Sequence, residues 1–211
     1  YEGSNKLGKS RKARWLPTWN VSTAWNAHEE EFWQPIRDVV SNMTLKASYS
    51  LTADRGPASV SNSKAIINSY NTWRPFTSVK ESGLILSNVE NSELTYEKKH
   101  ELNIGAEIGF IDNRINVEAD WYKRNNFDLI GLIYTKGTGG QLAKFANVAS
   151  MKSSGVELTV STHNIKTQDF SWNTDFIFSH AKNEVTDLQS NASVMDMISG
   201  NGFAMKGYPV R

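Results

Sequence analysis

The chain has 211 residues, enough to bury a core without the help of metals or disulfides. Its 23 Lys and Arg against 22 Asp and Glu leave a formal net charge of +1, which excludes a polybasic binder, and we expect no nucleic acid partner. The chain has no cysteine, so disulfide scaffolds, thiolate metal sites and cysteine nucleophiles are excluded together.

The hydropathy of the chain argues against helices that cross a membrane. Hydrophobic residues make up 39% of it, and no apolar run approaches the ~18 residues that a spanning helix needs. Transmembrane barrels remain open, because their strands alternate lipid-facing and lumen-facing residues. The 14 Gly, seven Trp, seven Tyr and nine Phe favour strands, turns and amphipathic rims. Without a Met start or a signal peptide, the sequence is expected to be a piece of a longer chain.

Six stretches of the sequence alternate apolar and polar side chains. This period of two is typical of a strand that separates two environments. In the second stretch, every odd position from Met43 to Leu51 is apolar and every even position from Thr44 to Thr52 is polar. The six predicted strands cover residues 15–26, 43–52, 102–110, 115–121, 156–161 and 170–179.

The links between these strands are of two kinds. Residues 111–114 and 163–169 are short links, whereas 53–96 and 125–147 are long and contain Gly or Pro. Outer-membrane barrels have this arrangement, with short periplasmic turns and long extracellular loops. Within residues 27–41 the apolar residues have helical spacing and Pro35 suits a first turn, which predicts a short amphipathic helix.

Two architectures fit this alternation. Trp15 and Trp25 lie ten residues apart on one predicted face, which at ~3.3 Å per residue and a ~40° tilt spans ~25 Å, the height of a barrel's apolar band. With Phe110 and Trp121 they form the predicted membrane girdle, in contact with outer-membrane lipid. The alternative is a secreted β-sandwich that binds glycans, in which the same apolar face packs against a second sheet.

Seven stretches resemble, in the same order, motifs of the SusC/RagA-type TonB-dependent outer-membrane transporters. For example, Asn147-Val148-Ala149, followed by Ser154 to Leu158, is similar to the pattern N-V-G-x-x-x-N-x-G-V-E-L. The opening residues Tyr1 to Gly8 resemble R-Y-D/E-G-S-S-x-x-F-G. The stretches cover residues 1–8, 16–25, 45–50, 96–105, 110–122, 147–158, and 170–185 with 207–209.

The resemblance implies an all-β fold, an antiparallel up-and-down segment of about six strands in a plugged transmembrane barrel of roughly 22 strands with long extracellular loops. Residues 1–211 would be a partial barrel domain without the plug domain or the closing C-terminal strand. The family imports nutrients such as oligosaccharides or peptides across the outer membrane of Gram-negative bacteria. Its partners are a SusD-type lipoprotein lid and the TonB complex, the latter through regions absent from this chain.

Catalytic and cofactor chemistry finds no support in the motifs. Glu29, Glu30 and Glu31 are adjacent and cannot converge on one cation from a helix surface. Residues 137–140 are rich in Gly but lack the order of a phosphate-binding loop, and no nucleophile elbow occurs. We expect no enzyme activity, no metal and no cofactor. The histidines do not pair at a metal-binding spacing such as H-x-x-x-H: His28, His100, His163 and His180.

Charged residues of the predicted polar face are expected to point into the barrel, where they meet water and the plug. These residues are Lys46, Glu107, Glu118, Asp120, Glu157 and Asp175. Contact with substrate or lid is expected from the first long loop, because aromatic rings and Arg suit sugar and peptide ligands. The four candidate residues there are Tyr70, Trp73, Arg74 and Phe76.

Overall fold

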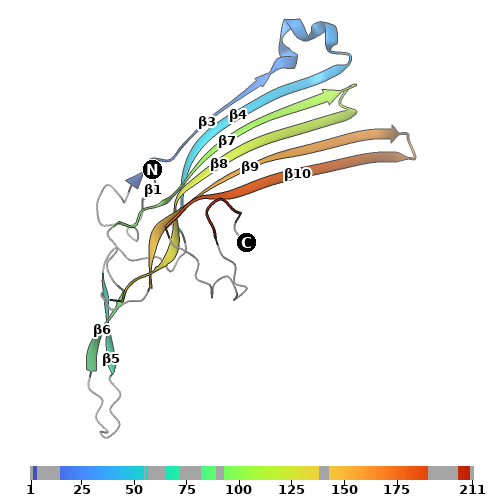
Figure 1. Cartoon of the computed structure of the whole chain (residues 1–211). Helices are drawn as coiled ribbons and strands as arrows, with labels where there is room; N and C mark the ends of the chain where they lie inside the picture. The colour runs from blue at the N-terminus through green and yellow to red at the C-terminus, as the bar shows by residue number, and fades with distance from the viewer. Residues whose placement is uncertain are drawn as a thin grey trace.

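The computed structural model of the chain is dominated by one curved antiparallel sheet (Figure 1). It describes residues 2–3, 15–54, 56, 65–71, 82–88, 93–137, 143–189 and 204–209. The sheet has six strands in the order β10-β9-β8-β7-β4-β3, which confirms the predicted up-and-down arrangement. They are β3 (Trp19–Asn26), β4 (Val40–Asp54), β7 (Glu97–Phe110), β8 (Ile115–Tyr134), β9 (Ala143–Lys166) and β10 (Ser171–Leu188).

Two small sheets lie beside the large one. Strand β1 (Glu2–Gly3) pairs with β2 (Trp15–Leu16), so Trp15 lies outside the six-stranded sheet. Strands β5 (Ile66–Asn71) and β6 (Ser82–Asn88) form an antiparallel pair within the predicted long loop. This β5–β6 hairpin projects from the end of the sheet that carries the long links (Figure 1).

Strands β8 and β9 are much longer than the sequence pattern predicted. The segment 125–147, predicted as a long loop, is mostly strand, and pairing continues from Leu129 opposite Ala149 to Tyr134 opposite Ala143. A bulge with Asp128 at φ 58° interrupts the ladder without ending it. The prediction was wrong because alternation reports two unlike environments, and here adjacent apolar residues such as Leu132 and Ile133 occupy both faces of the strand.

The opposite end of the sheet carries tight turns. Residues 111–114 form the predicted hairpin, in which Arg114 N–H donates to the Ile111 carbonyl at 3.1 Å. Asp112 and Asn113 adopt positive φ, a conformation that these two residue types tolerate well. The turn between β9 and β10 is shorter than the predicted 163–169 link, since Thr167 N–H already donates to the Phe170 carbonyl at 2.8 Å.

Residues 27–41 contain two short 3₁₀ helices instead of one amphipathic helix. They are η1 (Ala27–Glu29) and η2 (Glu31–Ile36), and β4 begins soon afterwards. Pro35 lies near the end of η2, where its missing N–H and its ring prevent an α-helix from continuing. Trp33 donates from its indole to the Val40 carbonyl at 2.9 Å, which holds η2 against β4. Within the described ranges, no helix is long and apolar enough to cross a membrane.

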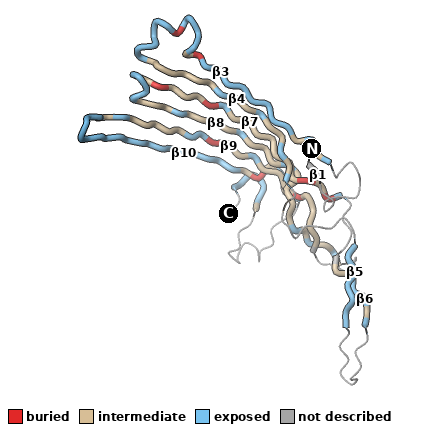
Figure 2. The backbone as a smooth tube through the Cα atoms, turned by 180° about the vertical axis from the view of Figure 1, so that it is seen from behind, coloured by how far each residue is buried: buried red, intermediate tan, exposed pale blue. Residues whose placement is uncertain are grey.

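Buried hydrophobic residues occur at both ends of the sheet (Figure 2): Ala27 and Trp33 lie in the 3₁₀ helices, and the others toward the long links are Leu94, Tyr96, Val148 and Val185. Leu94 and Tyr96, each 2% exposed, form a small core just before β7. The side chain of Asn147 fixes this segment, because its oxygen accepts from Thr95 N–H at 2.8 Å and its nitrogen donates to the Thr95 carbonyl at 2.9 Å. The same nitrogen donates to the Asp128 carbonyl at 2.5 Å. Partly buried residues around the core are Leu16, Ala53, Ile130 and Phe145.

A later segment returns to the outer edge of β10. Val185 N–H donates to the Tyr208 carbonyl at 2.9 Å, and Gly207 N–H donates to the Val185 carbonyl at 2.8 Å. Gly207 has φ 86°, which glycine adopts without a steric penalty. Residues 204–209 therefore take hydrogen-bonding positions on β10 that a further strand would otherwise use.

The apolar face of the sheet is uncovered in the described part of the chain. Ile104 is 48% exposed, Trp121 38% and Phe178 49%, although all three are large hydrophobic residues. In a β-sandwich these side chains would be packed against a second sheet. The sandwich alternative is therefore wrong, and the fold is that of a barrel wall.

We expect the 211-residue polypeptide on its own to aggregate in detergent-free buffer. An uncovered apolar face, and sheet edges that are open along much of their length, leave it without a stable form in water. Size-exclusion chromatography and thermal unfolding after refolding are the measurements. A monomer that melts cooperatively in this buffer would contradict the expectation.

Candidate functional site

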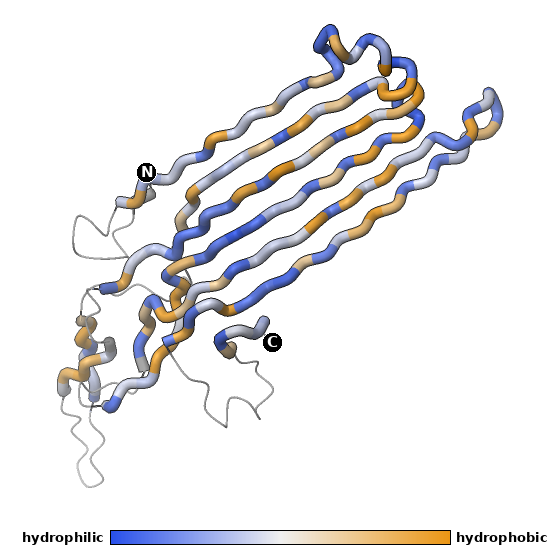
Figure 3. The backbone as a smooth tube through the Cα atoms, turned by 45° about the horizontal axis from the view of Figure 1, so that its top comes forward, coloured by the Kyte–Doolittle hydropathy of each residue, from blue (hydrophilic) through white to orange (hydrophobic). Residues whose placement is uncertain are grey.

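The backbone pairing assigns every strand residue to one of two faces. Residues directly opposite each other across an antiparallel ladder point to the same side, and we call such a set a row. One row is apolar throughout and defines the apolar face: Trp25, Leu45, Ala106, Ala119, Leu158 and Phe178. The next row defines the polar face: Ala24, Lys46, Gly105, Asp120, Glu157 and Ser179. Figure 3 shows the resulting alternation along the strands.

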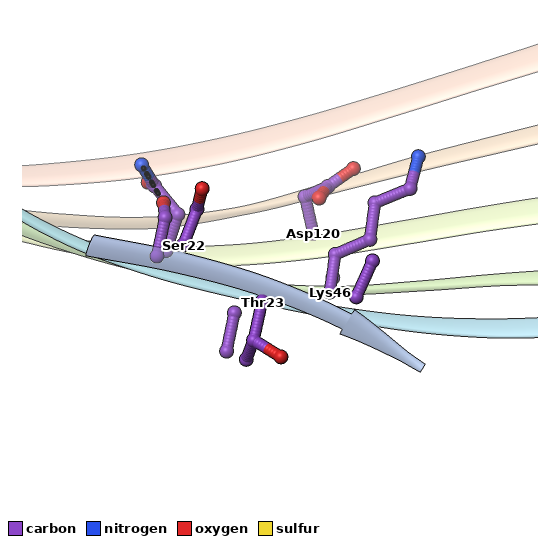
Figure 4. A pocket seen from close by; sticks show the side chains of 9 residues that line it. Ser22, Thr23, Lys46 and Asp120 are labelled. Carbon is purple, nitrogen blue, oxygen red and sulfur yellow. Dashed lines mark hydrogen bonds between the residues drawn. The ribbon is translucent and has the colours of Figure 1, made fainter. Parts of the chain in front are cut away.

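The first charged cluster of the polar face lies near the strand β3. Lys46 forms an ion pair with Glu107 across two neighbouring strands. Lys46 and Asp120 project from the same side of the sheet, and Thr23 projects from the other (Figure 4). These residues line an open pocket of about 480 Å³. The predicted inward-facing charges Lys46, Glu107 and Asp120 are thus brought together by three strands.

A second polar cluster lies nearer the long links and was missed from the sequence. Glu101, with only 11% of its side chain exposed, accepts from Lys99 and Arg124, each at 2.8 Å. Arg124 also lies over the ring of Tyr122 at 4.3 Å. Gly155 makes room for that ring, since a Cβ at this position would lie 2.6 Å from it. The predicted strands ended at residues 102 and 121, but continuing their alternation outward would have placed this cluster on the polar face.

The apolar run of each strand shifts along the sheet. Trp25 and Phe178 share a row, yet on β3 the run extends from Trp25 toward the long links, ending at Trp19. On β10 it extends from Phe178 toward the tight turns, ending at Trp172. Each run covers seven residues and so four positions of this face, one of them Thr. Because the runs extend in opposite directions from the shared row, they are offset by six residues.

This offset gives the inclination of the strands. Six residues are about 20 Å along a strand, and five strand spacings from β3 to β10 are about 24 Å. The strands are therefore tilted by about 40° from the normal to the apolar band, which agrees with the ~35–45° of outer-membrane barrels. On β7 the run extends without interruption from Leu102 to Phe110, a height of about 20 Å after correction for this tilt.

Aromatic rings form a chain that starts at the outer edge of the apolar band on β3 and β4 and runs beyond that edge on β7 and β8. Toward the long links, Trp19, Tyr49 and His100 form a chain of contacts, with ring centroids 5.3 Å and 5.9 Å apart. Phe127 continues it at 5.9 Å from His100. Sequence reasoning missed this chain, because its members come from four strands whose register was not known.

The predicted girdle residues lie at different places. Trp25 is at the edge near the tight turns, where its indole donates to Glu30 at 3.1 Å, and Phe110 ends its strand at the same edge. Trp121 is at the opposite edge, beyond which the same face of β8 becomes polar at Lys123. Trp15 is 60% exposed but belongs to β2, so the rows of the large sheet do not assign it a depth.

Of the predicted contact residues, only Tyr70 falls within the described part. It lies on β5 and is 52% exposed. Trp73, Arg74 and Phe76 lie outside the described residues. The hairpin exposes further apolar side chains, including Leu84 at 81% and Ile67 at 61%.

No metal centre is found where the structure describes the chain. Its His, Asp and Glu residues form no group of three that could hold an ion. Three of the histidines bind neighbouring groups: His28 contacts the Met43 backbone at 3.1 Å, His100 contacts Tyr49 at 3.0 Å, and His163 contacts Asn173 at 2.8 Å.

The comparison with known proteins agrees with this geometry. The family model described as TonB dependent receptor-like, beta-barrel matches residues 1–205. The chain belongs to this family. Among solved structures, the RagAB peptide importer in its open-open state superposes with a TM-score of 0.80 at 22% identity, over 97% of this chain and 21% of that one.

Relatives of known sequence extend the similarity. TonB-dependent receptor P3 of Formosa agariphila is 26% identical over 194 residues, which are 89% of this chain and 18% of that protein. TonB-dependent receptor SusC of Bacteroides thetaiotaomicron is 25% identical over 194 residues, 89% of this chain and 19% of that protein. The SusC/RagA-type resemblance is confirmed, and the chain spans about a fifth of the length of these relatives.

We expect Arg124→Ala to destabilise the whole receptor by about 1–3 kcal/mol, because it leaves the largely buried Glu101 carboxylate with one cation instead of two. Lys206→Ala is the control, since Lys206 and Asp187 are 3.8 Å apart and both well exposed, and such a pair contributes ~0–1 kcal/mol. Denaturant titration in detergent micelles measures both. Equal effects would show that the Glu101 cluster does not stabilise the wall.

Proposed function

We propose that the chain forms part of the barrel wall of a TonB-dependent active transporter in the outer membrane of a Gram-negative bacterium. The apolar face meets lipid and the polar face lines the lumen, where the two charged clusters contact water and the plug domain. The tight turns lie in the periplasm and the long links outside the cell, as in other outer-membrane barrels.

The single observation that supports this proposal is the oblique apolar band. A water-soluble sheet has no reason to shift its apolar run in one direction from β4 to β10. A strand that crosses a level hydrocarbon layer at about 40° must do so. The girdle then consists of Trp25 and Phe110 at the periplasmic edge, with Trp121, Trp19 and Tyr49 at the outer edge.

The proposed cargo is a nutrient, an oligosaccharide or a peptide, and the proposed partner at the outer mouth is a SusD-type lipoprotein lid. Support comes from the similarity to SusC and to the RagAB peptide importer. The TonB complex is a further proposed partner of the whole receptor, of whose relatives' length this chain spans about a fifth. The chain's own role is to hold the wall and present its extracellular parts, with no catalytic step.

Arginine substitutions test the position of the band. Leu45→Arg and Ile104→Arg should each cost ~2–4 kcal/mol in a refolding titration of the whole barrel, because both place a charge in hydrocarbon. Ser48→Arg on the polar face should be tolerated, since its charge remains in water.

A second pair of substitutions tests the tilt itself. Val21 and Ser154 lie in one row on the apolar face. Val21→Arg should cost as much as Ile104→Arg, whereas Ser154→Arg should cost only ~0–1 kcal/mol because the tilt places it beyond the band. Equal costs at Val21 and Ser154 would contradict the assignment of lipid to this face.

The β5–β6 hairpin is proposed to contact the lid or the substrate. An isolated two-stranded hairpin is marginal in water, and this one carries exposed apolar residues on both faces, including Ile67 and Leu84 on one and Tyr70 on the other. Such a surface is stabilised when another protein or loop covers it.

We expect deletion of residues 68–76, or the double change Ile67→Ser with Leu84→Ser, to reduce co-purification of the lipoprotein and uptake of the nutrient. Barrel assembly should be unchanged, because surface loops tolerate shortening. Asn68→Ser is the matched control within the hairpin. Normal co-purification and normal growth on the cognate nutrient would leave the hairpin without this role.

A further inference from the structure

The apolar face ends at the outer edge of the band in a group of lysine and histidine side chains. On each strand, the next position on this face lies two residues beyond the last apolar one. Moving outward, Leu102 is followed by His100, Trp121 by Lys123, and Phe178 by His180. Farther out on the last two strands come Lys152 and Lys182. We call Lys123, Lys152, His180 and Lys182 the basic patch.

Two lysines of the patch are placed to hold one ligand. Lys123 and Lys182 both lie opposite Ser154, one on each side of β9, so their Cα atoms are two strand spacings apart, about 10 Å. Ser154 is small and leaves the space between them open. Both lysines are exposed, and neither forms an ion pair with another described residue. Two flexible ammonium groups can thus converge on one anion.

The surrounding charges leave the patch positive. Lys152 is paired with Glu184 at 3.2 Å, and this is the carboxylate of β10 that lies nearest on the same face. Lys98, farther out on β7, is paired with Asp128 at 2.6 Å. The described carboxylates near the patch are therefore already neutralised, whereas Lys123 and Lys182 are not.

We propose that the basic patch binds the phosphate group of a lipid in the outer leaflet. This inference rests on the proposed function, because it takes the apolar face to meet lipid. Headgroups occupy roughly the 5–8 Å beyond the hydrocarbon edge, which is the depth of the Lys123 backbone. The Lys182 backbone lies ~10 Å beyond the edge on its own strand, and its long side chain reaches back to the headgroup level. The acyl chains of the same lipid would lie on Trp121, Val156 and Leu158, directly below on the same face. A phosphate free in solution would gain nothing from those apolar side chains.

The test uses the whole receptor in detergent micelles, titrated with lipid A and followed by native mass spectrometry. The double variant Lys123→Gln with Lys182→Gln should bind lipid A about 30-fold more weakly at low ionic strength, because each lysine near a lipid surface contributes about fivefold. Lys136→Gln with Lys166→Gln is the charge-matched control and should bind as the parent does. Dephosphorylated lipid A should bind the parent and the double variant equally weakly.

Two results would overturn the proposal. One is equal lipid A affinity of the parent and the Lys123→Gln, Lys182→Gln variant. The other is displacement of lipid A by inorganic phosphate at an equal concentration, which would make the ligand a free anion. The Val21 and Ser154 pair tests the membrane assignment separately. If Val21→Arg and Ser154→Arg behave as expected but the Lys123→Gln, Lys182→Gln variant binds lipid A as the parent does, the membrane assignment stands and only the proposed lipid site is wrong.

Discussion

The constraint on which this structure depends is the backbone ladder of a tilted sheet. In hydrocarbon every N–H and C=O must be paired within the protein, so the six strands incline together and keep one register. A level hydrocarbon layer then cuts each strand at a different residue. The apolar runs agree with this requirement, since the run covers Trp19–Trp25 on β3 and Trp172–Phe178 on β10.

Beyond the hydrocarbon layer, a different set of interactions holds the strands. There water can hydrogen-bond to every backbone group, so the pairing of the strands is less strictly enforced than in hydrocarbon. Side-chain contacts hold the strands together instead. Asn147 provides three hydrogen bonds at the point where the chain enters β7, and Lys98 pairs with Asp128 at the bulge. The small core of Leu94 and Tyr96 lies at the same level. The residues near the tight turns are therefore selected by contact with lipid on one face. The residues near the long links are held by polar contacts and by the small core.

This division explains which features could be predicted from the sequence. Alternation identified the six strands and their two faces, and it placed Lys46, Glu107 and Asp120 together, because lipid and lumen impose unlike residues there. It failed for the outer halves of β8 and β9, where apolar residues occupy both faces: Leu132 and Ile133 are adjacent on β8, and Ile130 and Phe145 pack around the core of Leu94 and Tyr96. The tilt depends on the register between strands, which no single strand encodes, so the aromatic chain from Trp19 to Phe127 could not be found. The 3₁₀ helices follow from Pro35 and from the Trp33 bond to Val40, a contact between residues that periodicity does not relate.

The segment 204–209 has a consequence for how the wall continues past β10. By pairing with Val185 on both its N–H and its carbonyl, it occupies the outer edge of that strand at one height. Any neighbouring strand can share hydrogen bonds with β10 only from about Lys182 down to Ser171, whereas β9 and β8 are paired far above that level. At the level of Val185 the edge of β10 is therefore closed by a turn and not by a strand, so the hydrogen-bonded sheet is narrower there than it is nearer the tight turns.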